Sequence, residues 1–128
     1  MSDWDSVFVD FKSPFDPKAL SWRQQGGVNL AYLNARDVMK RLDDTVGVEN
    51  WQDRYEEMGG RVICYLSIRV GDEWITKADG SGDTKIEGDK GGISGAFKRA
   101  AVRFGIGRYL YYLPKSASPS NLPKWAQP

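Results

Sequence analysis

The chain has 128 residues, with 18 Lys and Arg side chains against 17 Asp and Glu. This length and an apolar fraction of 41% suffice for one hydrophobic core but not for two. Because the chain contains no His, a Ser-His-Asp or Cys-His mechanism and a His-ligated metal are excluded. The single cysteine, Cys64, excludes an internal disulfide and a Cys-rich zinc site. Its apolar neighbours predict a buried thiol in a reducing compartment.

The sequence also lacks the features of a membrane protein. No run of about 18 apolar residues is present, and the acidic start Met1 to Asp5 does not resemble a signal peptide. We therefore expect a soluble cytoplasmic protein with no membrane partner.

Charge is unevenly distributed along the chain. Residues 1–89 carry 11 basic and 17 acidic side chains, a balance of −6. Residues 90–128 carry 7 basic side chains and no acidic one, a balance of +7. Charges separated in this way gather on different parts of the surface, and a basic region attracts phosphate groups.

Three regions follow from composition. Residues 1–27 combine Pro14 and Pro17 with scattered Phe and Trp, which predicts an extended N-terminal arm packed on its own domain or on a neighbouring subunit. A short strand and turn on the same core fits these residues equally well. Residues 28–113 carry the periodic elements of the domain itself. Residues 114–128 contain four prolines and predict an extended C-terminal tail.

The domain begins with a predicted helix over residues 29–46. Its apolar positions recur at spacings of four, three, four and four, which is typical of a helix with one buried face. Asn29 suits the N-cap, and Gly47 suits the left-handed residue that ends a helix. These apolar positions are Ala31, Ala35, Val38, Leu42 and Val46.

Three strands follow, over residues 51–58, 61–70 and 73–78. In the second, Val62, Cys64 and Leu66 face one way and the residues between them face the other, and Gly59-Gly60 before it is a two-residue hairpin signal. A loop over residues 79–83 precedes a short strand that reaches Glu87. The strands predict an antiparallel meander.

A second helix is predicted to begin near Gly92 and to end at Gly105, with a short strand over residues 108–112 after it. At 100° per residue, Arg99 and Arg103 fall on one flank of the apolar stripe and Lys98 opposite it, so the three form a solvent-facing basic surface with no acid among them. Solvated helix faces usually mix both signs, so this surface favours phosphate binding. The whole predicts an α+β fold, with a helix, three strands and a helix, and both helices on one face of a curled sheet.

Two other functions remain open on the residues alone. Asp72, Asp83 and Lys85 imitate the carboxylates and lysine with which some nucleases hold Mg²⁺ and activate water. A helix, three strands and a basic helix also describe the double-stranded-RNA-binding module.

The second helix resembles a known family. Residues 93–113 are similar to the helix that characterises the Rad52/Rad22 family, in the form found in phage and prophage single-strand annealing proteins. The resemblance extends in order through residues 31–39, 47–52 and 77–82, and to Trp22-Arg23 and residues 122–126. It therefore covers nearly the whole chain.

The resemblance implies a β-β-β-α core whose protomers join into a ring, and ATP-independent annealing of complementary strands in recombination and double-strand-break repair. It implies that single-stranded DNA lies in a basic groove contacted by Arg36, Lys98 and Arg99; the charge pattern of the helix adds Arg103 to these DNA-binding candidates. A second DNA strip is expected on the hairpin side, from Arg61, Arg69 and Lys77. No catalytic residue, metal or cofactor is implied. The implied partners are single-stranded DNA and other copies of the chain; a recombinase or single-strand-binding protein remains open.

Overall fold

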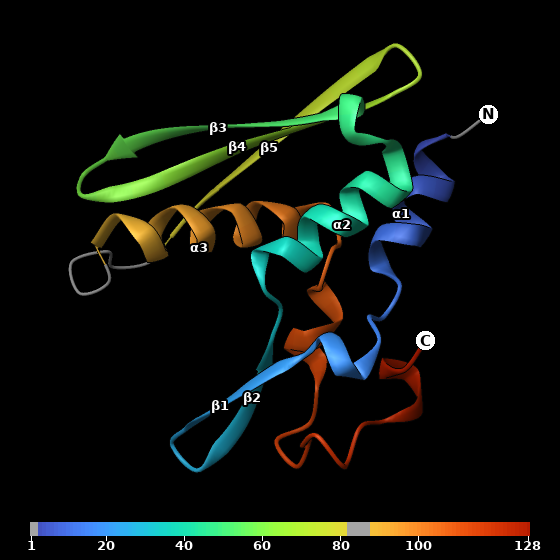
Figure 1. Ribbon diagram of the computed structural model, residues 1–128, viewed down its shortest axis with the longest axis vertical. Coiled ribbons are helices and arrows are strands. Elements are labelled where there is room, and N and C mark those ends of the chain that lie inside the picture. Colours follow the sequence, from blue (N-terminus) through green and yellow to red (C-terminus); the bar gives the residue numbers. More distant parts are fainter. Residues whose placement is uncertain (1–2, 82–87) are drawn as a thin grey trace.

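The computed structural model describes residues 3–81 and 88–128. Within these ranges the fold is α+β, as predicted, with a two-stranded and a three-stranded antiparallel sheet. Figure 1 shows the three-stranded sheet above α3 and the two-stranded hairpin below it. The main elements are α1 (Trp4–Lys12), β1 (Ser21–Gln25), β2 (Val28–Tyr32), α2 (Ala35–Val46), β3 (Trp51–Met58), β4 (Arg61–Val70), β5 (Glu73–Gly80) and α3 (Gly88–Arg103).

The three-stranded sheet is the predicted meander, in the order β3-β4-β5. Gly59 and Gly60 connect β3 to β4 with φ angles of 60° and 78°, which a two-residue hairpin turn of this hand requires. The predicted alternation on β4 is confirmed, since Cys64, Leu66 and Ile68 are all fully buried. β5 runs two residues past its predicted end, and the short strand predicted up to Glu87 lies outside the described residues.

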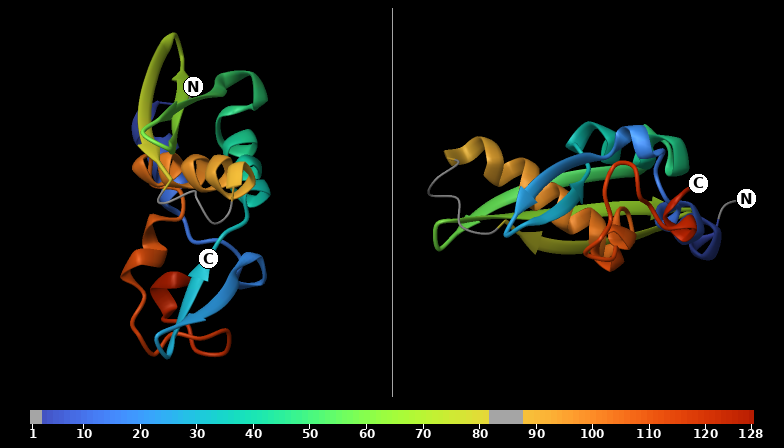
Figure 2. Two further views of the ribbon diagram at one scale, coloured as in Figure 1. Left: turned by 90° about the vertical axis from the view of Figure 1, so that its left-hand side faces the viewer. Right: turned by 90° about the horizontal axis from the view of Figure 1, so that it is seen from below.

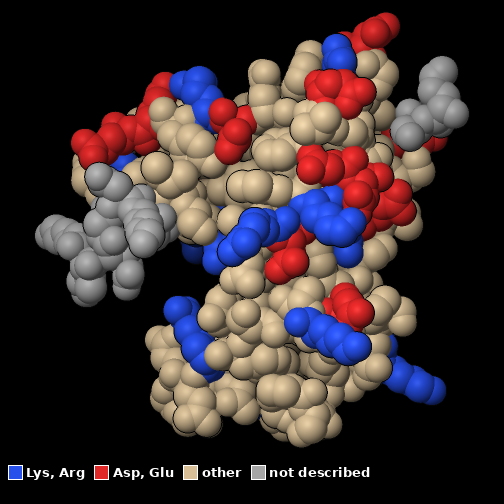
Figure 3. All heavy atoms as spheres, viewed as in Figure 1, with Lys and Arg blue, Asp and Glu red and all other residues tan. Residues whose placement is uncertain are grey.

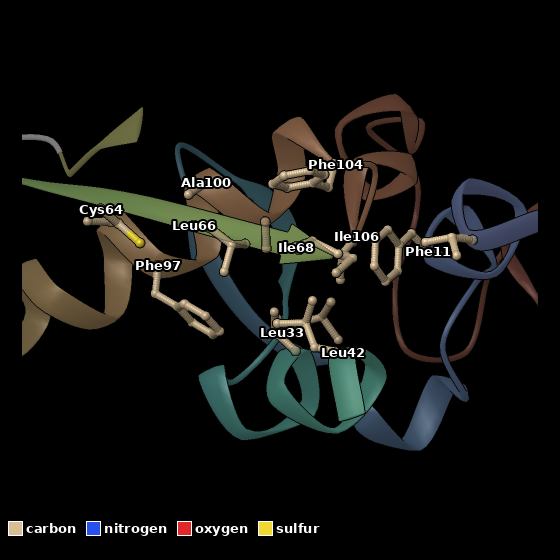
Figure 4. Close-up of a cluster of buried hydrophobic side chains, with 14 of the residues drawn as sticks. Phe11, Leu33, Leu42, Cys64, Leu66, Ile68, Phe97, Ala100, Phe104 and Ile106 are labelled. Carbon is tan, nitrogen blue, oxygen red and sulfur yellow. The ribbon is translucent and has the colours of Figure 1, made fainter. Parts of the chain in front are cut away.

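The main core lies between β4 and α3, with α2 closing one side. Phe97 and Ala100 of α3, with Phe104 directly after it, converge on Leu66 of β4, and Leu42 of α2 points into the same cluster (Figure 4). α2 and α3 therefore lie on the same face of the curled sheet, as predicted (Figure 2). The helix α3 begins at Gly88, four residues before its predicted start.

The N-terminal region contains the helix α1 and the strand β1, so the prediction of an extended arm is wrong, whereas the strand and turn of the alternative are present in β1 and Gly26-Gly27. Asp3 caps α1 by accepting a hydrogen bond from the Ser6 N–H at 2.9 Å, and Val7 and Phe11 are buried. Arg41 of α2 donates hydrogen bonds to backbone carbonyl oxygens between residues 10 and 14. This segment is thereby fixed to the core of its own chain.

The helix predicted from Asn29 begins six residues later. Residues 28–32 form β2, which pairs with β1 across a turn at Gly26 and Gly27. Asn34, rather than Asn29, occupies the N-cap position of α2. The hairpin prevails because its backbone hydrogen bonds require an extended chain up to Tyr32.

The C-terminal region also differs from its prediction. Residues 108–112 form the 3-10 helix η3 (Arg108–Tyr112) rather than a strand. The segment after it is not an extended tail, because it contains a bridge between Ser118 and Asn121 and the 3-10 helix η4 (Lys124–Ala126). Ala117 and Ala126 are buried, and Figures 1 and 2 show this segment beside β1 and β2. Among the helices of residues 3–81 and 88–128, none is both long and apolar enough to cross a membrane.

Candidate nucleic-acid interface

A groove of about 1000 Å³ separates α3 from the β1–β2 hairpin. Figure 3 shows the molecule narrowing at this level, with Lys and Arg side chains above and below the indentation. Lys98 and Arg99 line the groove from α3, whereas Arg23 of β1 and Lys115 line it from the other parts of its wall. The described residues that line the groove include no Asp or Glu. Much of the remaining lining is apolar, including Leu30, Leu33 and Val102.

Lys98 lies half-buried in this groove. Its ammonium nitrogen is 5.6 Å from the centre of the Tyr32 ring on β2, which is a cation–π distance. Burial, followed by repulsion from Arg23, lowers the pKa of Lys98 below its ordinary value of 10.5. Two cations are thus held near one another in a partly desolvated place, and a bound anion would relieve their repulsion.

Arg99 and Arg103 share an acidic neighbour that the sequence did not reveal. The Arg99 Nε is 3.5 Å from one carboxylate oxygen of Asp79, and the Arg103 Nε is 3.0 Å from the other. The predicted basic face without an acid is therefore wrong in this respect. Because Arg103 does not line the groove, the face divides: Lys98 and Arg99 point to the groove and Arg103 lies with Asp79 beside β5.

Asp79 is fixed at the end of β5. The Gly80 N–H donates a hydrogen bond of 2.8 Å to the same carboxylate oxygen that lies near Arg99. Burial alone would raise the pKa of Asp79. The Gly80 N–H, Arg103 and Arg99 outweigh it, so that the pKa falls below 3.8. Asp79 is therefore ionised at neutral pH and neutralises part of the charge on α3.

Arg36 lies on the first turn of α2, exposed to solvent. It is not one of the described groove-lining residues, although Val38 from the same helix is. No hydrogen bond or ion pair joins its side chain to another residue in the described part of the chain. Arg36 is therefore available next to the groove rather than inside it.

The three candidates for a second strip do not share one face of the sheet. Arg61 and Arg69 lie on the same face of β4, near its two ends; Arg61 donates to the Ser81 carbonyl and Arg69 to the Asn50 side chain. Lys77 is opposite Leu66 in the register and so faces α3, where it donates to the Arg103 carbonyl at 3.4 Å. The structure therefore separates Lys77 from the two arginines.

The residues of the nuclease hypothesis are only partly placed. Asp72 lies in the turn between β4 and β5, at the opposite end of β5 from Gly80, while Asp83 and Lys85 fall outside the described residues. No group of three or more potential metal-ligating side chains occurs among residues 3–81 and 88–128. The thiol of Cys64 is buried as predicted, and burial raises its pKa to about 11, so it is protonated at neutral pH.

Sequence reasoning missed three groove residues. The predicted helix over residues 29–46 contains Tyr32, and the predicted tail over residues 114–128 contains Lys115. The predicted arm contains Arg23, although Trp22-Arg23 belongs to the resemblance. The Gly26-Gly27 pair could have located Arg23 and Tyr32, because two glycines between short β-prone segments predict a hairpin.

Comparison with known proteins agrees with the resemblance. Residues 5–127 match the family described as Rad52/22 family double-strand break repair protein. The chain is 34% identical to the single-stranded DNA-binding protein DdrA of Deinococcus deserti and 31% identical to that of Deinococcus radiodurans. Each alignment covers 91% of this chain, and 68% and 65% of the respective relatives. The chain therefore belongs to the Rad52/22 family of double-strand break repair proteins.

Proposed function

We propose that this protein binds single-stranded DNA in the groove between α3 and the β1–β2 hairpin, and anneals complementary strands without ATP during recombination and repair. The observation that carries the proposal is the gathering of Arg23, Lys98, Arg99 and Lys115 around one groove whose described lining has no acid. Membership of a double-strand break repair family and the names of the two relatives support it.

The chemistry of the groove suits a single strand. Guanidinium and ammonium groups bind phosphates regardless of base sequence, and this indifference is what annealing of arbitrary sequences requires. Apolar lining such as Leu30 and Val102 offers contact to deoxyribose and to unpaired bases. A duplex has its bases paired inside and would make poorer use of this surface.

The residues contribute unequally in this proposal. Residues 28–113 supply Lys98 and Arg99, with Arg23 and Lys115 added from the flanking regions. Arg36 extends the phosphate path from the groove along the start of α2. Arg103 acts mainly at a distance, because its guanidinium is paired with Asp79. Any second DNA contact on the outer face of the sheet involves Arg61 and Arg69, whereas Lys77 belongs to the opposite face.

Annealing also needs an ordered array of bases longer than one small domain can hold, so we propose that the chain acts as a homo-oligomeric ring. β3 and β5 are the outer strands of their sheet, and outer strands offer backbone groups for pairing with another copy.

A recombinase or single-strand-binding protein would be a further partner. The protein would act in the cytoplasm of a bacterial cell. The phage or prophage origin stays a prediction. No catalytic residue or cofactor takes part in this mechanism.

The test is annealing of two complementary oligonucleotides without nucleotide or divalent metal, with a labelled strand to detect cleavage. We expect the protein to accelerate duplex formation and to leave both strands intact. Lys98→Ala with Arg99→Ala should abolish the acceleration while the mass of the oligomer in solution is unchanged. Equal annealing by wild type and the double variant would contradict the proposal, as would cleavage upon addition of Mg²⁺. Preferential binding of duplex RNA would favour the RNA-binding alternative.

A further inference from the structure

We infer that Asp79 competes with DNA phosphate for Arg99, and so limits how tightly, and for how long, each protomer holds a strand. The inference rests on the proposed function, because it concerns the same groove. Asp79 lies on β5 and does not line the groove. In this inference it sets how fast the strand is released, through its contact with Arg99.

The geometry of the pair makes Arg99 exchangeable between two partners. Its Nε is 3.5 Å from Asp79, longer than a typical hydrogen bond between charged groups. The Arg99 side chain retains 52% of its exposure and also lines the groove. An exposed ion pair of this kind is weak, so a phosphate can displace the carboxylate at small cost.

The carboxylate, in contrast, stays in place. Asp79 is held by the Gly80 N–H at 2.8 Å and by Arg103 at 3.0 Å, and its side chain is only 21% exposed. It therefore remains beside the groove whether or not Arg99 has moved to a phosphate. From there it repels the bound phosphate and attracts Arg99 back, and both effects favour release of the strand.

This competition suits an annealing protein. A strand must be held long enough to be ordered, yet it must shift and leave once it has paired. A groove with uncompensated cations only would bind more tightly and exchange more slowly. Asp79 thus makes exchange of the strand faster than it would be in a groove that contained the basic residues alone.

The experiment compares Asp79→Asn with a charge-matched control, Asp72→Asn, in the distant β4–β5 turn. Asparagine keeps the size of the side chain and an oxygen for the Gly80 N–H, so folding should be retained, which thermal unfolding checks. Binding and dissociation of fluorescent oligo(dT) are measured at fixed salt, because this probe cannot anneal to itself. We expect Asp79→Asn to lower Kd about three- to fivefold and to slow dissociation, well beyond the effect of Asp72→Asn.

A double-mutant cycle locates the effect. In an Arg99→Ala background, the gain of Asp79→Asn over Asp72→Asn should shrink, because only the direct repulsion between Asp79 and the phosphate remains. Asp79→Asn without a gain over Asp72→Asn in the wild-type background would overturn the inference, as would a gain of undiminished size in the Arg99→Ala background.

A measurement without DNA separates this inference from the proposed function. Inorganic phosphate is titrated while the NMR signal of the Arg99 Nε–H is followed. We expect that signal to respond at lower phosphate concentration in Asp79→Asn than in wild type. If wild type fails to bind oligo(dT), the proposed function fails, and the phosphate titration still decides for or against the competition. Identical titrations in the two proteins would refute it.

Discussion

The ammonium nitrogen of Lys98 on α3 lies 5.6 Å from the centre of the Tyr32 ring on β2, so a cation on one wall of the groove contacts an aromatic ring on the other. The aromatic ring partly replaces the water that Lys98 loses on burial. Arg23, on the strand paired with β2, adds a second positive charge that lowers the pKa of Lys98 further. The groove therefore holds two neighbouring positive charges, Lys98 and Arg23, before any anion binds.

The pH dependence of binding follows from this environment. The pKa of Lys98 in the folded protein is below 10.5, so as pH rises this residue loses its charge earlier than an ordinary lysine does. Affinity for oligo(dT) should therefore decline as pH rises through that lowered pKa. Lys98→Arg keeps its charge at these pH values and should remove this early decline. Anisotropy titrations between neutral and alkaline pH measure both proteins, and superimposable pH profiles would refute the assignment.

Replacing Arg23 is predicted to weaken DNA binding and to raise the pKa of Lys98. Arg23→Ala should weaken binding of oligo(dT), because one phosphate contact of the groove is lost. The same substitution should raise the pKa of Lys98, because a neighbouring like charge disappears. Affinity titrations and NMR of the Lys98 side chain measure the two effects. Lys18→Ala, in η1 (Pro17–Ala19), removes an exposed positive charge that does not line the groove and serves as the control.

The N-terminal helix is predicted to be part of the folding core. Phe11 is fully buried, and its ring meets the ring of Phe104, directly after α3, edge-on at a centroid distance of 6.4 Å. Phe11→Ala should therefore reduce the free energy of unfolding by about 3–5 kcal/mol. Val9→Ala, at a residue of the same helix that is 61% exposed, should change it by no more than about 0.5 kcal/mol. Urea unfolding compares them, and similar values would show that α1 does not belong to the core.

Local patterns predicted the elements that fold by their own periodicity. The alternation of β4 and the Gly59-Gly60 turn located the meander, and the helical spacing located most of α3. The helix α1 was missed although Trp4, Val7, Phe8 and Phe11 have the same helical spacing. The two prolines that follow it, Pro14 and Pro17, suggested an arm, but they lie after the helix and do not interrupt it.

The remaining differences come from contacts between distant parts of the chain. Ala31 fits the helical spacing of α2 and also fits β2, and pairing with Trp22 of β1 decides in favour of the strand. The five residues of η3 are too few for a periodic pattern to separate helix from strand. Asp79 and Arg99 are twenty residues apart, so neither spacing nor composition could show that they form an ion pair. The basic helix α3 could therefore be predicted from the sequence. The β1–β2 wall of the groove and the position of Asp79 beside α3 could be found only from the folded structure.

The salt dependence of single-strand binding tests the central claim most directly. The observed association constant of oligo(dT) is measured over a range of salt concentrations for wild type and for Lys98→Ala with Arg99→Ala. The charge-matched control is Lys18→Ala with Lys124→Ala, two exposed residues that do not line the groove. Because each phosphate contact to a single strand contributes about 0.7 to the logarithmic slope, the groove variant should lose about 1.4 for each protomer that the strand contacts. The control should keep the wild-type slope and affinity, and a groove variant that behaves like this control would contradict the account.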